Sequence, residues 1–282
     1  MTTRTMTSTE WAATRGGRWG SHLSDMEAML VPVDEPLIRA LRLETPCRIA
    51  EVGCGGGGTT REILRRAPEG SIVHGFDISP SLVASARARD EYDDRVMGFQ
   101  VADMATAIPP AGLYDRLVSR FGIMFFDNPP AAFANLSRWI SPGGRFAFAV
   151  WGPMAENPWM TTVRDVVGEF IELPPTDPEG PGPFRYAEAD KLLSLLERAG
   201  FGETEVCDWR GEFTVGGRFP AAEAASFALA SFSSFGEQLA EAGESICEAA
   251  HQALTARFLR HERNGAVRLD AKVRLFTGLR MA

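Results

Sequence analysis

The chain has 282 residues, of which 45% are hydrophobic and 23% charged, and its formal net charge at pH 7 is −8. This length and composition predict a globular protein with a sizeable core, built as one large domain or as one domain with a cap. Proteins that hold a polyanion by neutralising its phosphates need clustered Lys and Arg, so the acidic balance disfavours nucleic acid as a partner.

The cysteines and the N-terminus indicate the compartment. Cys47, Cys54, Cys207 and Cys247 lack the spacing of a zinc site or of a disulfide framework. We therefore expect no metal and a reducing, cytoplasmic setting. The N-terminal residues lack the apolar core of a signal peptide, and no run reaches the ~18 apolar residues of a membrane span, so a soluble protein is expected.

The first 150 residues alternate helical and extended patterns. A helical pattern over 21–43, broken by prolines, precedes a strand over 48–52, the Gly-rich turn EVGCGGGG and a helix over 59–66. Further strands are predicted over 71–78, 98–101, 113–121 and 145–151, with helices over 79–89 and 129–140 and the turn SPGG at 141–144. Repeated strand–helix alternation requires right-handed crossovers, which predicts a parallel, doubly wound α/β sheet.

The second half of the chain is less regular. Two helices, over 160–171 and 187–199, flank a Pro- and Gly-rich stretch at 173–183, where a lid or insertion is expected. A sixth strand over 200–212, a helical region over 220–263 and a closing strand over 265–280 follow. We expect three parts: a helical N-terminal lid over 1–46, a ligand-binding core over 47–151, and the rest of the sheet with substrate-cap insertions over 152–282.

The turn EVGCGGGG allows a ligand to approach the backbone at the start of a helix. Gly53, Gly55 and Gly58 also satisfy the GxGxxG pattern of dinucleotide binders, with Asp77 following at the usual distance. The charge of Glu51 separates the two cases, because a carboxylate repels pyrophosphate but suits a ligand that carries an ammonium and a sulfonium. Glu51 therefore favours S-adenosylmethionine over NAD, unless it merely caps the turn.

Two further acids end neighbouring strands. Asp77 ends the second strand, where a carboxylate can accept hydrogen bonds from both ribose hydroxyls in either cofactor family. The third strand ends in QVADM, so Asp103 could accept the exocyclic amine of adenine, with the Met104 backbone near the ring edge. A solvated loop acid is the alternative for Asp103.

The motifs EVGCGGGG, GFDIS, VADM, YDRLVSRFGIMFF and SPGGRFAFAVW, in this order, resemble class I methyltransferases similar to those of ubiquinone and menaquinone biosynthesis. The resemblance covers about 47–151, and more loosely ENPWM, GPFRYAEAD and the terminal strand. It implies a Rossmann-like sheet of about seven strands, with a helical cap late in the chain, and S-adenosylmethionine as cofactor. By resemblance, the methionine part would lie against Glu51, Gly53, Gly55 and Gly57, the ribose and adenine against Asp77, Ile78, Asp103 and Met104, and the sulfonium end beside Ser119, Arg120 and Phe121.

Two segments differ from this pattern or extend it. Glu51 stands where the family usually has aspartate, a conservative departure. The segment RGGRW, which ends at Trp19, resembles an N-terminal segment that closes over the cofactor. An ordinary surface helix start is an equal alternative for it.

Methyl transfer from a sulfonium demands alignment and desolvation, and a base only when the acceptor must lose a proton. His22, near the expected lid, is the best candidate base, with a surface or capping histidine as the alternative. His74 lies inside a strand and is expected to pack, whereas His251 and His261 are expected to be solvated. Tyr186, Glu156 and Arg120 could orient a substrate or serve structure alone.

The acceptor pocket is expected to be apolar, over the carboxyl ends of the fourth and fifth strands and under the late helices. Its expected residues are Met124, Phe125, Trp151, Trp159, Tyr186 and Phe232. Core packing is the alternative for each of them. Together they favour a small hydrophobic or aromatic acceptor, such as a specialised metabolite or a quinone precursor.

Two other functions compete with methyl transfer. An NAD(P)-dependent oxidoreductase would need a Tyr/Lys pair, and neither Lys191 nor Lys272 lies near a suitable tyrosine in the sequence. A non-catalytic module that binds S-adenosylmethionine is the third reading. A homodimer is left open.

Overall fold

The protein is described here by a computed structural model over residues 20–89, 96–175 and 177–282. Its strands form a sheet in the order β3-β2-β1-β4-β5-β8-β6, with β7 paired to β8. The strands are β1 Arg48–Val52, β2 Ile72–Asp77, β3 Met97–Val101, β4 Tyr114–Arg120, β5 Ile140–Trp151, β6 Phe201–Thr214, β7 Glu262–Arg263 and β8 Ala266–Arg280. β1 to β5 pair in parallel, and β8 lies antiparallel between β5 and β6.

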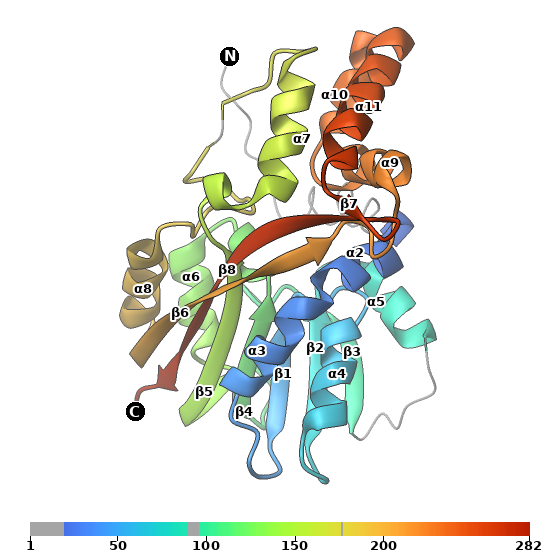
Figure 1. Ribbon diagram of the computed structural model, residues 1–282. Helices are drawn as coiled ribbons and strands as arrows, with labels where there is room; N and C mark the ends of the chain where they lie inside the picture. The colour runs from blue at the N-terminus through green and yellow to red at the C-terminus, as the bar shows by residue number, and fades with distance from the viewer. Residues whose placement is uncertain (1–19, 90–95, 176) are drawn as a thin grey trace.

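The helices lie around this sheet and beyond one of its ends (Figure 1). They are α2 Leu23–Leu30, α3 Asp34–Ala40, α4 Gly58–Arg66, α5 Pro80–Ala88, α6 Pro129–Leu136, α7 Pro158–Gly168, α8 Ala189–Arg198, α9 Ala221–Ser231, α10 Phe235–Ala242 and α11 Glu244–Leu259, with short 3-10 turns η1 Val31–Val33, η2 Ile123–Phe125 and η3 Met154–Glu156. In Figure 1, α7, α9, α10 and α11 gather at the top, beyond the carboxyl ends of the parallel strands. They form the cap over the sheet.

The predicted doubly wound α/β fold is confirmed, and the differences are local. The SPGG sequence, expected as a turn, falls inside β5, and the helix expected to reach residue 140 ends at Leu136. The helical region expected over 220–263 is three helices, because α9 ends at Ser231 and Gly243, with φ +114°, separates α10 from α11. Only glycine adopts such a backbone angle readily, so a continuous helix cannot pass it.

Local sequence accounts for the helix starts that position the site. Ser79 precedes Pro80 and its side chain accepts the backbone N–H of Leu82 at 3.4 Å, which caps α5 directly after β2. Asn128 caps α6 in the same way after β4, by accepting the N–H of Ala131 at 3.2 Å. Side-chain acceptors of this kind satisfy N–H groups that have no partner within the helix.

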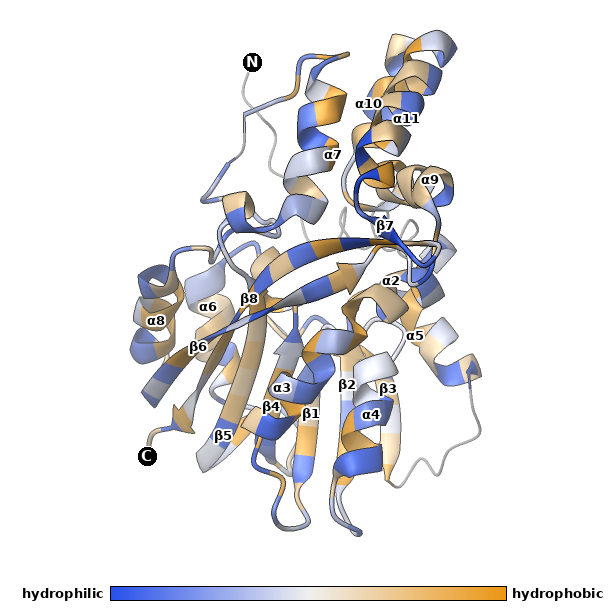
Figure 2. Cartoon of the chain, viewed as in Figure 1, coloured by the Kyte–Doolittle hydropathy of each residue, from blue (hydrophilic) through white to orange (hydrophobic). Residues whose placement is uncertain are grey.

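The core lies between the central strands and the helices that cover them. Figure 2 shows the parallel strands as mostly hydrophobic, whereas β8 carries bands of both kinds. Phe146, Phe148 and Phe276 of β5 and β8 are fully buried, as strands covered on both faces require. Each helix among the described residues is too short or too polar to cross a lipid bilayer.

Candidate functional site

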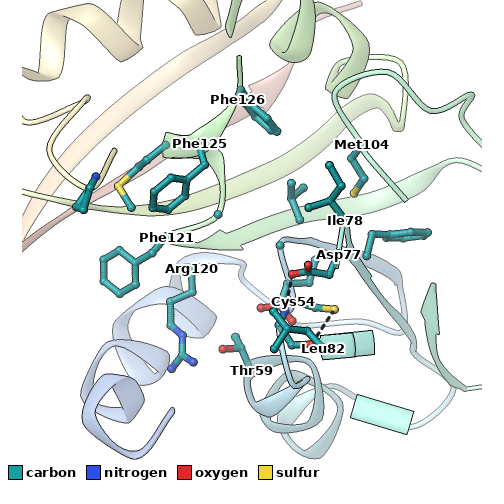
Figure 3. Close-up of a pocket in the computed structure, with 18 of the residues that line it drawn as sticks. Cys54, Thr59, Asp77, Ile78, Leu82, Met104, Arg120, Phe121, Phe125 and Phe126 are labelled. Carbon is teal, nitrogen blue, oxygen red and sulfur yellow. Dashed lines mark hydrogen bonds between the residues drawn. The ribbon is translucent and has the colours of Figure 1, made fainter. Parts of the chain in front are cut away.

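A cavity of about 280 Å³ opens at the carboxyl ends of β1, β2, β3 and β4, between α2 and the residues that end and follow α9. This is the edge of an open α/β sheet where ligands bind. Figure 3 shows Asp77 and Ile78 on one side of the cavity and Phe121 and Phe125 on the other. The site residues predicted from sequence that line it are Glu51, Gly53, Gly55, Asp77, Ile78, Asp103, Met104, Arg120, Phe121, Met124, Phe125, Trp151, Trp159 and Phe232.

The Gly-rich turn between β1 and α4 needs its glycines for two different reasons. Gly55 has φ +54°, and a Cβ there would meet no protein atom within 4 Å, so that space belongs to the cavity. Gly53 has φ +70°, and a Cβ would lie 2.9 Å from the Cα of Gly122. Gly57, predicted to line the methionine part, caps α4 instead, and its Cβ would lie 2.5 Å from the Phe99 ring. It does not line the cavity.

Asp77 lies at the centre of this edge. Its Oδ2 accepts the backbone N–H of Gly55 at 2.9 Å, and its Oδ1 accepts that of Ser79 at 2.8 Å. Burial raises the pKa of this carboxyl, while the two backbone N–H donors act in the opposite direction. Each oxygen keeps a further lone pair for a ligand hydroxyl.

The methionine end of the predicted site is a buried group of acids around one guanidinium. Glu51 is 1% exposed and accepts the hydroxyl of Thr60, and burial raises its pKa to about 8. Asp34 of α3 accepts the hydroxyl of Thr59 at 3.0 Å and pairs with Arg120 at 3.1 Å. Asp34 therefore neutralises the charge of Arg120 within the site. In Figure 3 the guanidinium of Arg120 points towards Thr59.

Helix α2 supplies a wall that sequence reasoning missed. Glu27 Oε1 accepts the backbone N–H of Gly58 at 3.3 Å, and its other oxygen pairs with Arg89 of α5. A carboxylate at the first N–H groups of α4 is favoured by the helix dipole. The helical spacing over 21–43 indicated a buried face, but nothing in that spacing said that the face would meet the cavity. Its lining residues are Leu23, Met26, Glu27, Met29 and Leu30.

Asp103 and Met104, which are predicted to lie against the adenine, line the cavity just after β3. Asp103 accepts the backbone N–H of Ala105 and the hydroxyl of Thr106, both at 3.0 Å, which stabilises the turn after β3. The carbonyl of Met104 accepts the side-chain amide of Asn135 at 2.9 Å. The turn is therefore held in place before any ligand arrives.

Aromatic rings form the opposite end of the cavity. Phe121 stacks flat on Trp151, with ring centroids 4.3 Å apart and 9° between planes, and Trp151 contacts Trp159 at 4.4 Å. Phe232 of the cap meets Trp159 edge-on at 5.1 Å. Asn157 orients Trp159 by accepting its indole N–H at 3.1 Å. That these rings hold an acceptor stays a prediction.

Besides Gly57, three predicted residues of the described part of the chain lie outside the cavity lining. Ser119 donates to the Val52 carbonyl at 2.8 Å and accepts the Gly122 N–H at 3.2 Å, so it joins β4 to β1. Tyr186 is fully buried beside Phe133, and its hydroxyl has no hydrogen-bond partner in the described part of the chain. His22 precedes α2, with its ring edge-on to Phe227 at 5.7 Å. Their roles in binding or catalysis stay predictions.

Trp19 and Glu156 were also candidates for the site. Trp19 and the RGGRW segment lie outside the described residues. Glu156 pairs with Lys272 of β8 at 3.0 Å and with Arg210 of β6 at 2.5 Å, and it does not line the cavity. Its ion pairs therefore connect η3 to these two strands. In the described ranges, no three His, Cys, Asp or Glu side chains come together as a metal site requires.

The fold and the site together define a class of protein. A Gly-rich turn follows β1 of the parallel part of the sheet, Asp77 ends β2, and Glu51 is buried beside the turn. Part of the chain is similar to S-adenosylmethionine-dependent methyltransferase domains. Residues 50–148 match the model of the methyltransferase domain family.

Known proteins agree with this class. Malonyl-[acyl-carrier protein] O-methyltransferase of Hahella chejuensis is 32% identical over 120 residues, which are 43% of this chain and 42% of that protein. The chain thus spans less than half the length of this relative. The solved structure of the YcgJ protein of Bacillus subtilis shares the fold with a TM-score of 0.56 and 13% identity, and the match covers 88% of this chain and 98% of that one. Phosphoethanolamine N-methyltransferase 2 of Haemonchus contortus, solved in complex with S-adenosylhomocysteine, shares it with a TM-score of 0.51 and 17% identity. That match covers 89% of this chain and 53% of the other. The solved structures show the fold alone, and the resemblance to quinone-biosynthesis enzymes stays a prediction.

Proposed function

We propose that this protein transfers the methyl group of S-adenosylmethionine to a small hydrophobic or aromatic acceptor. The observation that carries the proposal is the division of one cavity into an acidic end and an aromatic end. Glu51 and Asp77 line the cavity at the Gly-rich turn. Phe121 lies across from Asp77 (Figure 3), and its ring continues into those of Trp151 and Trp159. A donor bound along the turn would present its sulfonium to an acceptor held among the rings.

The aromatic end suits the chemistry of this transfer. An in-line displacement at a methyl group needs the two reacting atoms aligned and water excluded. Trp151 and Trp159 are 5% and 4% exposed, so they offer a dry and rigid wall. An acceptor stacked there would lose most of its freedom before reaction, and only an acceptor that must lose a proton would need a base.

The charge of the lining argues against a dinucleotide. Five carboxyl groups and one guanidinium line the cavity among the described residues. Burial favours the neutral form of Glu51, and Asp34 neutralises the guanidinium. A pyrophosphate would meet acids at the turn, whereas the positive charges of S-adenosylmethionine would be favoured there. NAD(P) as cofactor is therefore the weaker candidate.

Calorimetric titration with S-adenosylhomocysteine and, separately, with NAD tests the cofactor. We expect binding of the first and none of the second, and the reverse would overturn the proposal. Turnover is tested with methyl-labelled donor and a panel of phenols, quinone precursors and aliphatic controls. Donor binding with no transfer to any acceptor would favour the non-catalytic module.

Our remaining proposals concern context. We propose a small-molecule acceptor rather than nucleic acid, a cytoplasmic location, and a division into the parts 1–46, 47–151 and 152–282. Whether the protein is a homodimer is tested by sedimentation at micromolar concentration. Limited proteolysis tests the division, because cleavage should concentrate near residues 46 and 151 if the parts are separate.

A further inference from the structure

Phe121 follows directly after β4 and has a left-handed backbone, with φ +64°. This conformation costs a non-glycine residue roughly 1–2 kcal/mol, and such residues cluster at functional sites. The N–H of Phe121 is held by the Ala149 carbonyl at 2.9 Å, and its ring is held flat against Trp151. The chain thus fixes a strained residue so that one aromatic ring lines the cavity.

The strand order indicates which part of the cofactor reaches this ring. Asp77 ends β2 and Asp103 follows β3, where they suit ribose and adenine, and β1 separates these two strands from β4. A cofactor whose adenosine lies over β2 and β3 therefore extends across the Gly-rich turn of β1 towards the end of β4. Phe121 stands at that end, opposite Asp77 (Figure 3).

The charges beside Phe121 do not oppose a cation there. Arg120, its neighbour in sequence, pairs with Asp34 at 3.1 Å, and both side chains are 8% exposed. This pairing leaves no net positive charge next to the ring. The face of an aromatic ring attracts a cation placed within about 6 Å of its centroid, and the attraction grows when water is excluded.

We propose that Phe121, supported by Trp151, binds the sulfonium of the methyl donor through its ring face and so favours the donor over its demethylated product. This inference rests on the proposed function. During transfer, an electron pair of the acceptor forms the new bond to the methyl carbon, and the pair of the carbon–sulfur bond returns to sulfur. The positive charge thereby leaves the sulfur, and the neutral thioether product loses its attraction to the ring.

Ligand binding tests this without any acceptor. The ligands are S-adenosylmethionine, sinefungin, which carries an amine in place of the sulfonium, and S-adenosylhomocysteine, all measured by calorimetry. In Phe121→Leu we expect the affinity for the two cationic ligands to fall ~3–30-fold, the usual range for a ring–cation contact, and that for S-adenosylhomocysteine to change less than about twofold. Leu carries the same backbone strain as Phe at φ +64°, so the fold is matched.

Two variants control the experiment. Phe121→Tyr keeps the ring and should keep the donor-to-product affinity ratio, and Phe258→Leu removes a buried ring outside the cavity and should leave that ratio unaltered. Phe121→Met serves as a second variant without a ring if Phe121→Leu does not fold. An equal loss of affinity for all three ligands overturns the inference alone. If the wild-type protein binds none of them, the proposed function fails as well.

Discussion

Asp77 Oδ2 accepts the backbone N–H of Gly55 at 2.9 Å, and this contact ties the end of β2 to the Gly-rich turn after β1. The residue predicted to bind the ribose therefore also shapes the turn that would contact the rest of the cofactor. Removing its carboxylate should affect both parts of the ligand.

We predict that Asp77→Ala lowers the affinity for S-adenosylhomocysteine by two or more orders of magnitude. A carboxylate that accepts ligand hydroxyls contributes roughly 1.5–3 kcal/mol per bond, and the variant also loses the bond to Gly55. Calorimetry measures the affinity, with Asp270→Ala, an exposed acid of β8, as control. Near-wild-type affinity in Asp77→Ala would remove the ribose assignment.

Gly55→Val should prevent cofactor binding while costing the fold little. A Cβ at Gly55 meets no protein atom, so the side chain would project into the cavity, and the strain comes only from φ +54°. Gly143→Val is the matched control, because Gly143 also has positive φ and open space around it but does not line the cavity. Both variants should lose similar stability in thermal unfolding. Only Gly55→Val should lose affinity, and a crystal with cofactor bound to that variant would contradict the prediction.

Much of the sheet could be predicted because parallel strands buried on both faces leave short apolar runs, and because Ser79 and Pro80 mark a helix start. The acids at strand ends were found for the same reason, since strand ends share one edge. Pairing across the sheet was harder, and the insertion of β8 between β5 and β6 depends on contacts far apart in sequence. The spacing of hydrophobic residues along the sequence does not indicate which distant strands pair.

Side-chain direction accounts for the rest of the differences. Ser119 and Phe121 stand two residues apart near the end of β4, yet Ser119 bonds to β1 while the left-handed backbone of Phe121 brings its ring to the cavity. Glu27 was not predicted, because an acid on an amphipathic helix usually faces water, and its contact with Gly58 exists only in the folded chain. Local patterns could therefore indicate the edge of the sheet but not each lining residue.

Glu51→Gln should flatten the dependence of stability on pH. Burial raises the folded pKa of Glu51 to about 8 from its ordinary value of 4.5, so between these values the folded state binds more protons than the unfolded state. The contribution of Glu51 to the free energy of unfolding is fully present below pH ~4.5 and is lost as pH rises through ~8. Over this range the free energy of unfolding falls by up to ~1.4 kcal/mol per pH unit. Burial also raises the pKa of Asp34, so a weaker slope of the same sign should remain.

Urea unfolding at pH 5, 6.5 and 8 measures this slope. The wild type should lose stability over this range more steeply than Glu51→Gln, and Glu205→Gln, an exposed acid of β6, should behave as the wild type does. Identical slopes in the wild type and Glu51→Gln would show that Glu51 is ionised throughout.

Substitution by alanine should affect stability differently at two serines near the site. Ser119→Ala removes a buried hydroxyl with two partners and should lower the free energy of unfolding by about 1–3 kcal/mol. Ser231 lines the cavity, and its buried Oγ has no hydrogen-bond partner within the described ranges, so Ser231→Ala should change stability by less than ~0.5 kcal/mol or increase it. Denaturant unfolding compares the two, and equal losses would contradict the prediction.

His22→Ala tests the proposed base. A general base contributes ~10²–10⁴-fold to kcat/KM, and only neutral imidazole accepts a proton, so such a role requires a rate that rises with pH. The ring of His22 packs edge-on against Phe227 and does not line the cavity, which places it poorly for that role. We therefore expect His22→Ala to reduce kcat/KM less than about threefold and to leave the pH profile unchanged. A loss of a hundredfold or more, with cofactor affinity preserved, would instead identify His22 as the base and require that α2 move when the acceptor binds.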